Sequence, residues 1–135
     1  MAEDTLVENW IDDGRKLIEE LVQRGFEVTA GCWVYPSEAR RWRFYIISPL
    51  VDTVGFREAA GRLHAVEWAM PPTYSIETLT TRLIGPSDPI ARDLFRLQGR
   101  PTRTIAGFVR LPSMIVDHQS IDDAYYYAIP AVASR

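Results

Sequence analysis

The hydrophobic pattern of the sequence changes its period at Gly25, and this change limits the folds open to the chain. Residues 5–24 repeat apolar side chains at helical spacing, which predicts an amphipathic helix with one buried stripe. Residues 26–35 and 42–47 alternate apolar and polar side chains around the polar turn 36–40, which predicts a β-hairpin. A helix followed by a hairpin favours an α+β domain in which the helix lies across a sheet.

The first predicted helix has recognisable ends. Thr5 and Glu8 have the spacing of a capping box, and Gly25 stands where a left-handed residue commonly ends a helix. Trp10 and Leu17 belong to the apolar stripe, so we expect both side chains to lie in the core.

The rest of the chain continues the alternation of helices and strands. The same two periods predict a helix over 55–69, a strand over 79–84, a helix from Asp88 and Pro89 to Gly99, a strand over 102–111, one helical turn at 120–123 and a last strand over 125–129. We therefore predict a single α+β domain over residues 1–135, with a mostly antiparallel five-stranded sheet and helices packed on one face.

Composition and charge exclude several classes of protein. With 47% hydrophobic and 24% charged residues, a chain of 135 residues can bury a core, so it is neither disordered nor dependent on disulfides. The acidic start lacks a signal-peptide pattern, and the apolar stretch 124–133 is too short to cross a bilayer, so we expect a cytoplasmic protein without a membrane partner.

Residues 38–110 carry eleven basic and seven acidic residues, a net of +4. Although this segment can attract phosphate, a sequence pI near 5.4 argues against a dedicated nucleic-acid binder.

The motifs of several enzyme classes are missing from the sequence. It has no P-loop, GxSxG elbow or GxGxxG fingerprint, which weighs against P-loop NTPases, α/β-hydrolases and Rossmann oxidoreductases. Cys32, the only cysteine, lies in a predicted strand beside apolar residues, which favours a core side chain over a nucleophile. His64 and His118, the only histidines, form no metal-binding pattern. We therefore predict no catalytic residue, no metal and no cofactor.

Arginines around an aromatic residue mark the predicted hairpin as a candidate binding surface. Arg40, Arg41 and Arg43 surround Trp42, and this combination can pair with phosphates and stack on bases. The alternative is a two-faced strand with Arg41 and Arg43 toward solvent and Trp42 in the core, which we favour.

Acidic residues near the hairpin raise the alternative of a metal-dependent phosphodiesterase. Asp52 follows the second strand, Glu38 lies in the turn and Glu27 starts the first strand. The only lysine, Lys16, lies in the first helix and far from them in sequence, which weakens this interpretation. Asp52 is better explained as a cap of the following segment.

Three successive tyrosines suggest an interface at the last strand. Tyr125, Tyr126 and Tyr127 place aromatic rings on both faces of that strand, and a terminal strand at a sheet edge can pair with a second copy. We therefore name Tyr126 as a candidate contact in a homodimer. The alternative is that one face of the strand packs on the helices and Tyr126 simply lies on the surface.

Three stretches, at 25–30, 45–52 and 84–93, resemble segments of short bacterial proteins of unassigned function. The resemblance covers most of residues 1–129 and implies a bacterial source and a stand-alone domain, but it implies no catalytic residue. The residues themselves favour a non-enzymatic binding or interaction module whose partner is a protein or a second copy of the chain. A nucleic-acid-binding domain and a small metal-dependent phosphodiesterase or nuclease are the alternatives.

Overall fold

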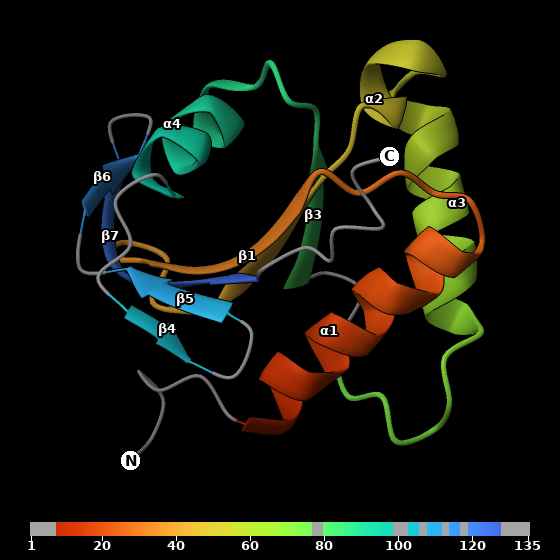
Figure 1. Ribbon diagram of the computed structural model, residues 1–135, viewed down its shortest axis with the longest axis horizontal. Helices are drawn as coiled ribbons and strands as arrows, with labels where there is room; N and C mark the ends of the chain where they lie inside the picture. Colours follow the sequence, from red (N-terminus) through yellow and green to blue (C-terminus); the bar gives the residue numbers. More distant parts are fainter. Residues whose placement is uncertain are drawn as a thin grey trace.

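The computed structural model describes residues 8–76, 80–98, 103–105, 108–111, 114–116 and 119–127, and these form an α+β fold (Figure 1). The elements follow in the order α1 (Glu8–Gln23), β1 (Ala30–Pro36), β2 (Arg43–Ile47), α2 (Leu50–Thr53), α3 (Phe56–Trp68), β3 (Thr81–Ile84), α4 (Pro89–Gln98), β4 (Arg103–Ile105), β5 (Phe108–Leu111), β6 (Met114–Val116) and β7 (Gln119–Tyr127). The three predicted helices and the first hairpin are confirmed, although β1 begins later than the alternation suggested.

The sheet is mixed, with the strand order β3-β2-β1-β7-β5-β4 and with β6 also paired to β7. β1 and β2 are antiparallel, whereas β3 runs parallel to β2, with Phe44 opposite Thr81 and Ile47 opposite Ile84. The parallel pair follows from the crossover through α2 and α3, which returns the chain to the same end of the sheet. The predicted mostly antiparallel five-stranded sheet is therefore wrong. In the structure, β1, β2 and β3 form a mixed three-stranded unit, with one antiparallel pair and one parallel pair.

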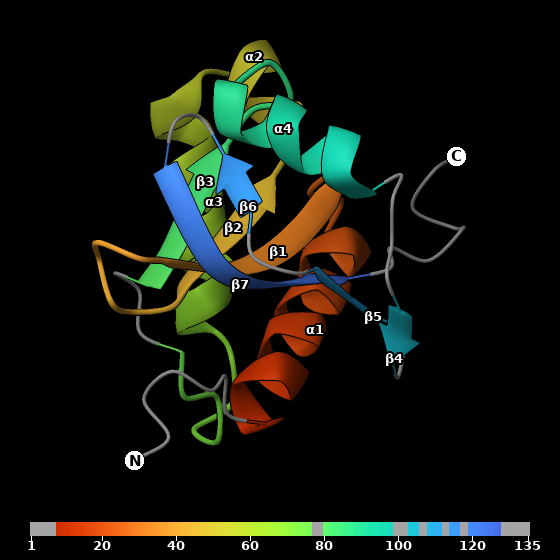
Figure 2. The same ribbon diagram turned by 90° about the vertical axis from the view of Figure 1, so that its left-hand side faces the viewer.

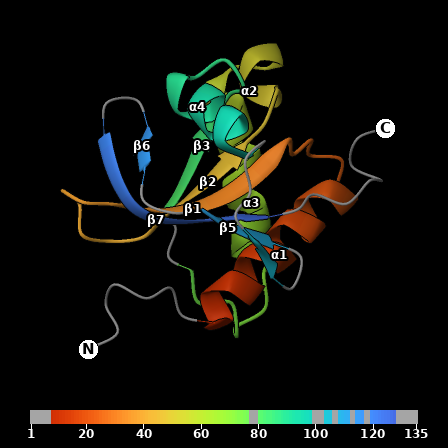
Figure 3. The same cartoon turned by 60° about the vertical axis from the view of Figure 1, so that its left-hand side comes forward.

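Helices cover both faces of this unit (Figure 3). On one face, α1 and α3 pack against Trp33 and Phe44, and on the other Leu94 of α4 packs against Cys32. Every residue of β1 is consequently buried. The prediction that all helices pack on one face is wrong, because helical spacing reveals a buried stripe but not which face of a sheet receives it.

Gly25 ends α1 as predicted. It has a φ of +84°, its amide donates to the Val22 carbonyl at 3.1 Å, and the Phe26 amide donates to the Leu21 carbonyl at 2.9 Å. These two bonds form a Schellman motif, which directs Phe26 back into the core beside the helix. Thr5, the other predicted cap residue, lies outside the described residues.

An aromatic stack joins α1 to the sheet. The fully buried Trp33 ring lies between Trp10, with ring centroids 5.7 Å apart, and Phe44, with centroids 4.7 Å apart. Trp10 itself is only partly buried, so the expectation that its whole side chain lies in the core is too strong. The centre of the stack is Trp33.

The last strand lies inside the sheet (Figure 2). Tyr126 of β7 pairs with Cys32 of β1 on one side and with Val109 of β5 on the other. The prediction of a terminal edge strand is therefore wrong, as is the helical turn at 120–123. That short polar segment is held extended by the neighbouring strands, which override its local preference. The predicted strand 102–111 is a hairpin of β4 and β5.

Candidate binding site

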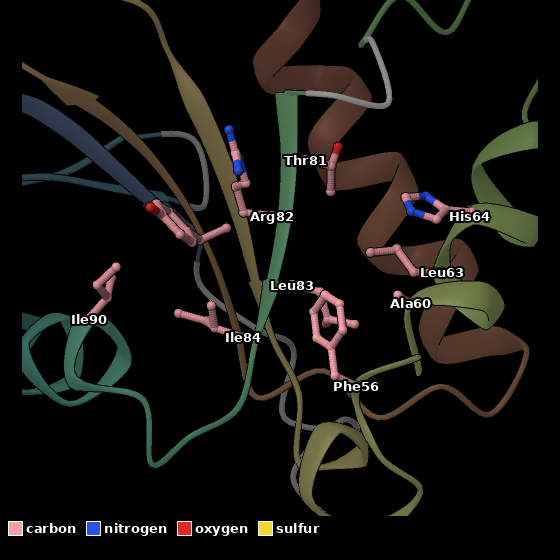
Figure 4. Close-up of a pocket in the computed structure, with 10 residues that line it drawn as sticks. Phe56, Ala60, Leu63, His64, Thr81, Arg82, Leu83, Ile84 and Ile90 are labelled. Carbon is pink, nitrogen blue, oxygen red and sulfur yellow. The ribbon is translucent and has the colours of Figure 1, made fainter. Parts of the chain in front are cut away.

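A pocket of about 380 Å³ lies at the β3 edge of the sheet, between α3 and α4 (Figure 4). Its walls come from four elements: Phe56, Ala60, Leu63 and His64 of α3; Thr81, Arg82, Leu83 and Ile84 of β3; Tyr45 of β2; and Ile90 of α4. Apolar and polar groups contribute about equally to its exposed wall. A concave surface on which apolar side chains and polar groups converge is a candidate ligand site.

The backbone of β3 forms part of this pocket. β3 is the outermost strand at this end of the sheet, so no strand in the described part of the chain pairs with its outer side. The Ser48 amide donates to the Ile84 carbonyl at 3.0 Å, so Ile84 turns its backbone groups toward β2. Because neighbouring residues of a strand turn their backbone groups to opposite sides, the N–H and C=O of Leu83 point outward. The pocket therefore contains a strand edge that can form further main-chain hydrogen bonds.

The helix beside this edge exposes aromatic side chains. Phe56 at the start of α3 is 58% exposed, and Trp68 at its end is 78% exposed. Between them, Ala60 and His64 follow at intervals of four residues, and the His64 ring stacks on Trp68 with centroids 6.5 Å apart. The apolar surface of the pocket thus continues along α3 beyond the pocket itself.

Arg82 gives the pocket a positive charge. Its side chain is exposed, and it takes part in none of the ion pairs formed among the residues that the structure describes. Figure 4 shows it on the opposite side of β3 from His64. An exposed guanidinium beside an apolar surface suits a ligand that combines apolar groups with a carboxylate or another anion.

Glu67 fixes α3 to β3 behind the pocket. Its side chain is 2% exposed, and its Oε2 accepts hydrogen bonds from Thr81 Oγ1 at 2.9 Å and Tyr74 Oη at 3.2 Å. Its Oε1 lies 3.2 Å from His64 Nδ1. Burial, followed by the charge of Glu67, raises the pKa of Tyr74 above its ordinary value of 10.0, so the phenol remains a donor. The buried carboxylate thereby positions Thr81 and His64 on the pocket wall.

The residues of the predicted hairpin site differ in their exposure to solvent. Arg40 and Arg41 are exposed in the β1–β2 turn, and Arg43 is half-buried. Trp42 is only 5% exposed and packs edge-on against Tyr35, with ring centroids 5.3 Å apart. A buried indole does not stack on a base, so the aromatic part of the predicted nucleic-acid surface is absent from this hairpin.

Glu38 and Asp52, two of the three acidic residues of the predicted phosphodiesterase site, are not brought together. Glu38 lies in the β1–β2 turn, whereas Asp52 lies in α2, beyond the opposite end of β2. Asp52 caps neither α2 nor α3, and its Oδ1 lies against Gly85, where an added Cβ would be 3.3 Å away. Glu27 is exposed ahead of β1, and Lys16 pairs with a neighbour on α1. The described residues contain no group of three or more His, Cys, Asp or Glu that could hold a metal ion.

No sequence motif marks α3 or β3 as a ligand site. The helical spacing of residues 55–69 predicts Phe56 on the same buried stripe as Ala59 and Leu63, whereas α3 buries Ala59 and Leu63 and leaves Phe56 exposed. The predicted strand over 79–84 is short and contains the charged Arg82. This combination is typical of a strand at a sheet edge, and it could have indicated the position of β3. The second histidine considered as a ligand, His118, lies outside the described residues.

Cys32 is a core residue, as predicted. The alternation of residues 26–35 predicts it on one face with Phe26 and Val28, whereas it packs with α4 and those two residues lie in the other core cluster. Those two residues precede β1, so the alternation of its strand does not extend to them. Burial raises the pKa of the Cys32 thiol far above its ordinary value of 9.0.

This raised thiol pKa predicts a loss of stability in alkali. Above the ordinary thiol pKa, the unfolded chain releases a proton that the folded chain keeps, so the free energy of unfolding falls as pH rises. For Cys32 the expected slope is about 1.4 kcal/mol per pH unit. Urea unfolding at about pH 8 and about pH 10.5 measures it. The Cys32→Ala variant should lose less stability over this interval than the parent chain, and an equal loss in both would contradict the prediction.

Comparisons of the chain with family models, with curated proteins and with solved structures give no match. Among the helices in the described ranges, none is long and apolar enough to cross a membrane. The candidate site is therefore interpreted from its own geometry.

Proposed function

We propose that this protein is a non-enzymatic binding module whose ligand site is the pocket at the β3 edge. The observation that carries the proposal is a pocket of about 380 Å³ in which apolar side chains of α3, β3 and α4 meet polar groups, among them the exposed side chain of Arg82. Such a site favours a ligand that has an apolar part and a negative charge.

The alternative functions have less support. Nucleic-acid binding is supported by the exposure of Arg40 and Arg41. However, Trp42, the aromatic residue predicted to stack on a base beside them, is buried. Metal-dependent phosphodiester hydrolysis would need carboxylates close together, whereas Glu38 and Asp52 lie toward opposite ends of the hairpin.

The test uses 8-anilino-1-naphthalenesulfonate, an aromatic anion, as the probe. We expect saturable binding of one probe per folded chain, measured by fluorescence titration. Ala60→Leu places a larger side chain in the pocket and should weaken binding about tenfold, a change of about 1.4 kcal/mol. Arg82→Gln should weaken it several-fold, because the sulfonate loses its ion pair.

Each variant has a matched control. Gly61→Leu lies next to Ala60 on α3, and an added Cβ there meets nothing within 4 Å, so probe binding should not change. Arg41→Gln removes an exposed arginine in the β1–β2 turn and should likewise have no effect. If Ala60→Leu binds the probe as tightly as Gly61→Leu does, the pocket is not the binding site.

A further inference from the structure

We infer that the partner is an extended protein segment, with alternating apolar and acidic residues, that adds to β3 as a further strand. This inference rests on the proposed function, namely that the pocket is the ligand site. It concerns the form and chemistry of the ligand, and three independent features of the pocket support it.

The first feature is that the pocket includes both faces of the sheet edge. Leu83 packs with the core cluster beneath α3, whereas Ile84 packs on the α4 side, near Ile90. Figure 4 shows Phe56 and Ala60 on one side of β3 and Ile90 on the other. An added strand would send alternate side chains toward α3 and toward α4, which matches a pocket that has walls on both sides.

The second feature is the set of main-chain groups at this edge. The N–H and C=O of Leu83 point away from β2, as required for hydrogen bonds to an incoming strand. The exposed rings of Phe56 and Trp68 extend the apolar surface along α3, which runs beside β3 in Figure 1. An extended ligand would cover more of this surface than a compact one.

The third feature is charge, which favours an acidic partner over a second copy paired in the register that places Arg82 opposite Arg82. The exposed Arg82 side chain can pair with a carboxylate of the partner. If two β3 edges paired with Thr81 opposite Leu83, the two Arg82 side chains would lie directly opposite each other, and like charges in that position destabilise a pair of strands. The charge of the edge therefore favours an acidic segment.

The test uses two fluorescein-labelled, end-capped heptapeptides as probes. In one, valine alternates with glutamate, and in the other, valine alternates with lysine. Fluorescence anisotropy should show saturable binding of the glutamate peptide and at least about tenfold weaker binding of the lysine peptide. In Arg82→Glu this preference should reverse, whereas Arg41→Glu, which makes the same change of net charge in the β1–β2 turn, should keep the parental preference.

Amide hydrogen exchange followed by NMR shows whether the peptide binds as a strand. Exchange of the Leu83 amide should slow when the glutamate peptide is bound. The Ile84 amide already faces β2 and provides the internal control. Peptide binding that leaves Leu83 exchange unchanged would overturn strand addition.

The remaining outcomes separate this inference from the proposed function. If neither peptide binds but the naphthalenesulfonate probe still occupies the pocket, strand addition is wrong and the pocket remains a ligand site. If no probe binds, both proposals fail. If Leu83 exchange slows with rising protein concentration alone, and light scattering shows a dimer, the occupant of the edge is a second copy and the acidic-segment proposal is overturned.

Discussion

Replacing Trp33 with alanine should lower the free energy of unfolding by about 3–5 kcal/mol, the range typical of a fully buried large aromatic residue. The Trp33 side chain has no exposed surface, and its ring lies between those of Trp10 and Phe44. The variant loses apolar burial and two stacked contacts, and it leaves a cavity where α1 meets β1 and β2. Urea or thermal unfolding measures the loss.

Two other tryptophans provide the comparison. Trp68 is 78% exposed, so Trp68→Ala should change stability by no more than about 0.5 kcal/mol. Trp10 is partly buried at one end of the stack, so Trp10→Ala should fall between the two. If Trp33→Ala unfolds at the same urea concentration as Trp68→Ala, the described packing of the core is wrong.

Replacing Glu67 with leucine should destabilise the protein by about 3 kcal/mol or more, since a buried polar group left without a partner costs about 1–3 kcal/mol. Thr81 Oγ1 and Tyr74 Oη both donate to Glu67 Oε2, and His64 Nδ1 lies beside Oε1. Leucine fills the space but accepts none of these hydrogen bonds. Chemical unfolding gives the stability of the variant.

Glutamine tests whether the hydrogen bonds cause this loss. In Glu67→Gln the amide oxygen can still accept from Thr81 and Tyr74, so most of the stability should return. Glu58→Leu is the matched control, because Glu58 is exposed on the same helix and forms only a surface ion pair with Arg62. Equal losses for Glu67→Leu and Glu67→Gln would show that the hydrogen bonds do not hold α3 against β3.

The elements of this fold that depend on local signals could be predicted from the sequence. Gly25 ends α1 with a positive φ, and the Asp88 carboxylate accepts a hydrogen bond from the Ile90 amide at the start of α4. Both features depend on residues within a few positions of each other. Local chemistry decides them, so they can be inferred before the tertiary structure is known.

The arrangement of the elements could not be predicted in the same way. Nothing within Thr81–Ile84 indicates whether that strand joins β2 in parallel, and nothing near Tyr126 indicates that β5 and β1 lie on either side of it. These pairings form between residues far apart in sequence and are selected by the packing of the whole chain. The pocket depends on the same arrangement, because α3, β3 and α4 meet only after β3 has paired with β2.

The place of β7 inside the sheet has a consequence for how the chain is made. β1 and its partner β2 are both synthesised well before β7, so the other edge of β1 waits for residues 121–126. Until those residues are synthesised, an apolar strand presents open hydrogen-bonding groups to other chains, a condition that promotes aggregation. A product of stalled translation that ends just before β7 should therefore be insoluble, although it contains every other helix and strand that the structure describes.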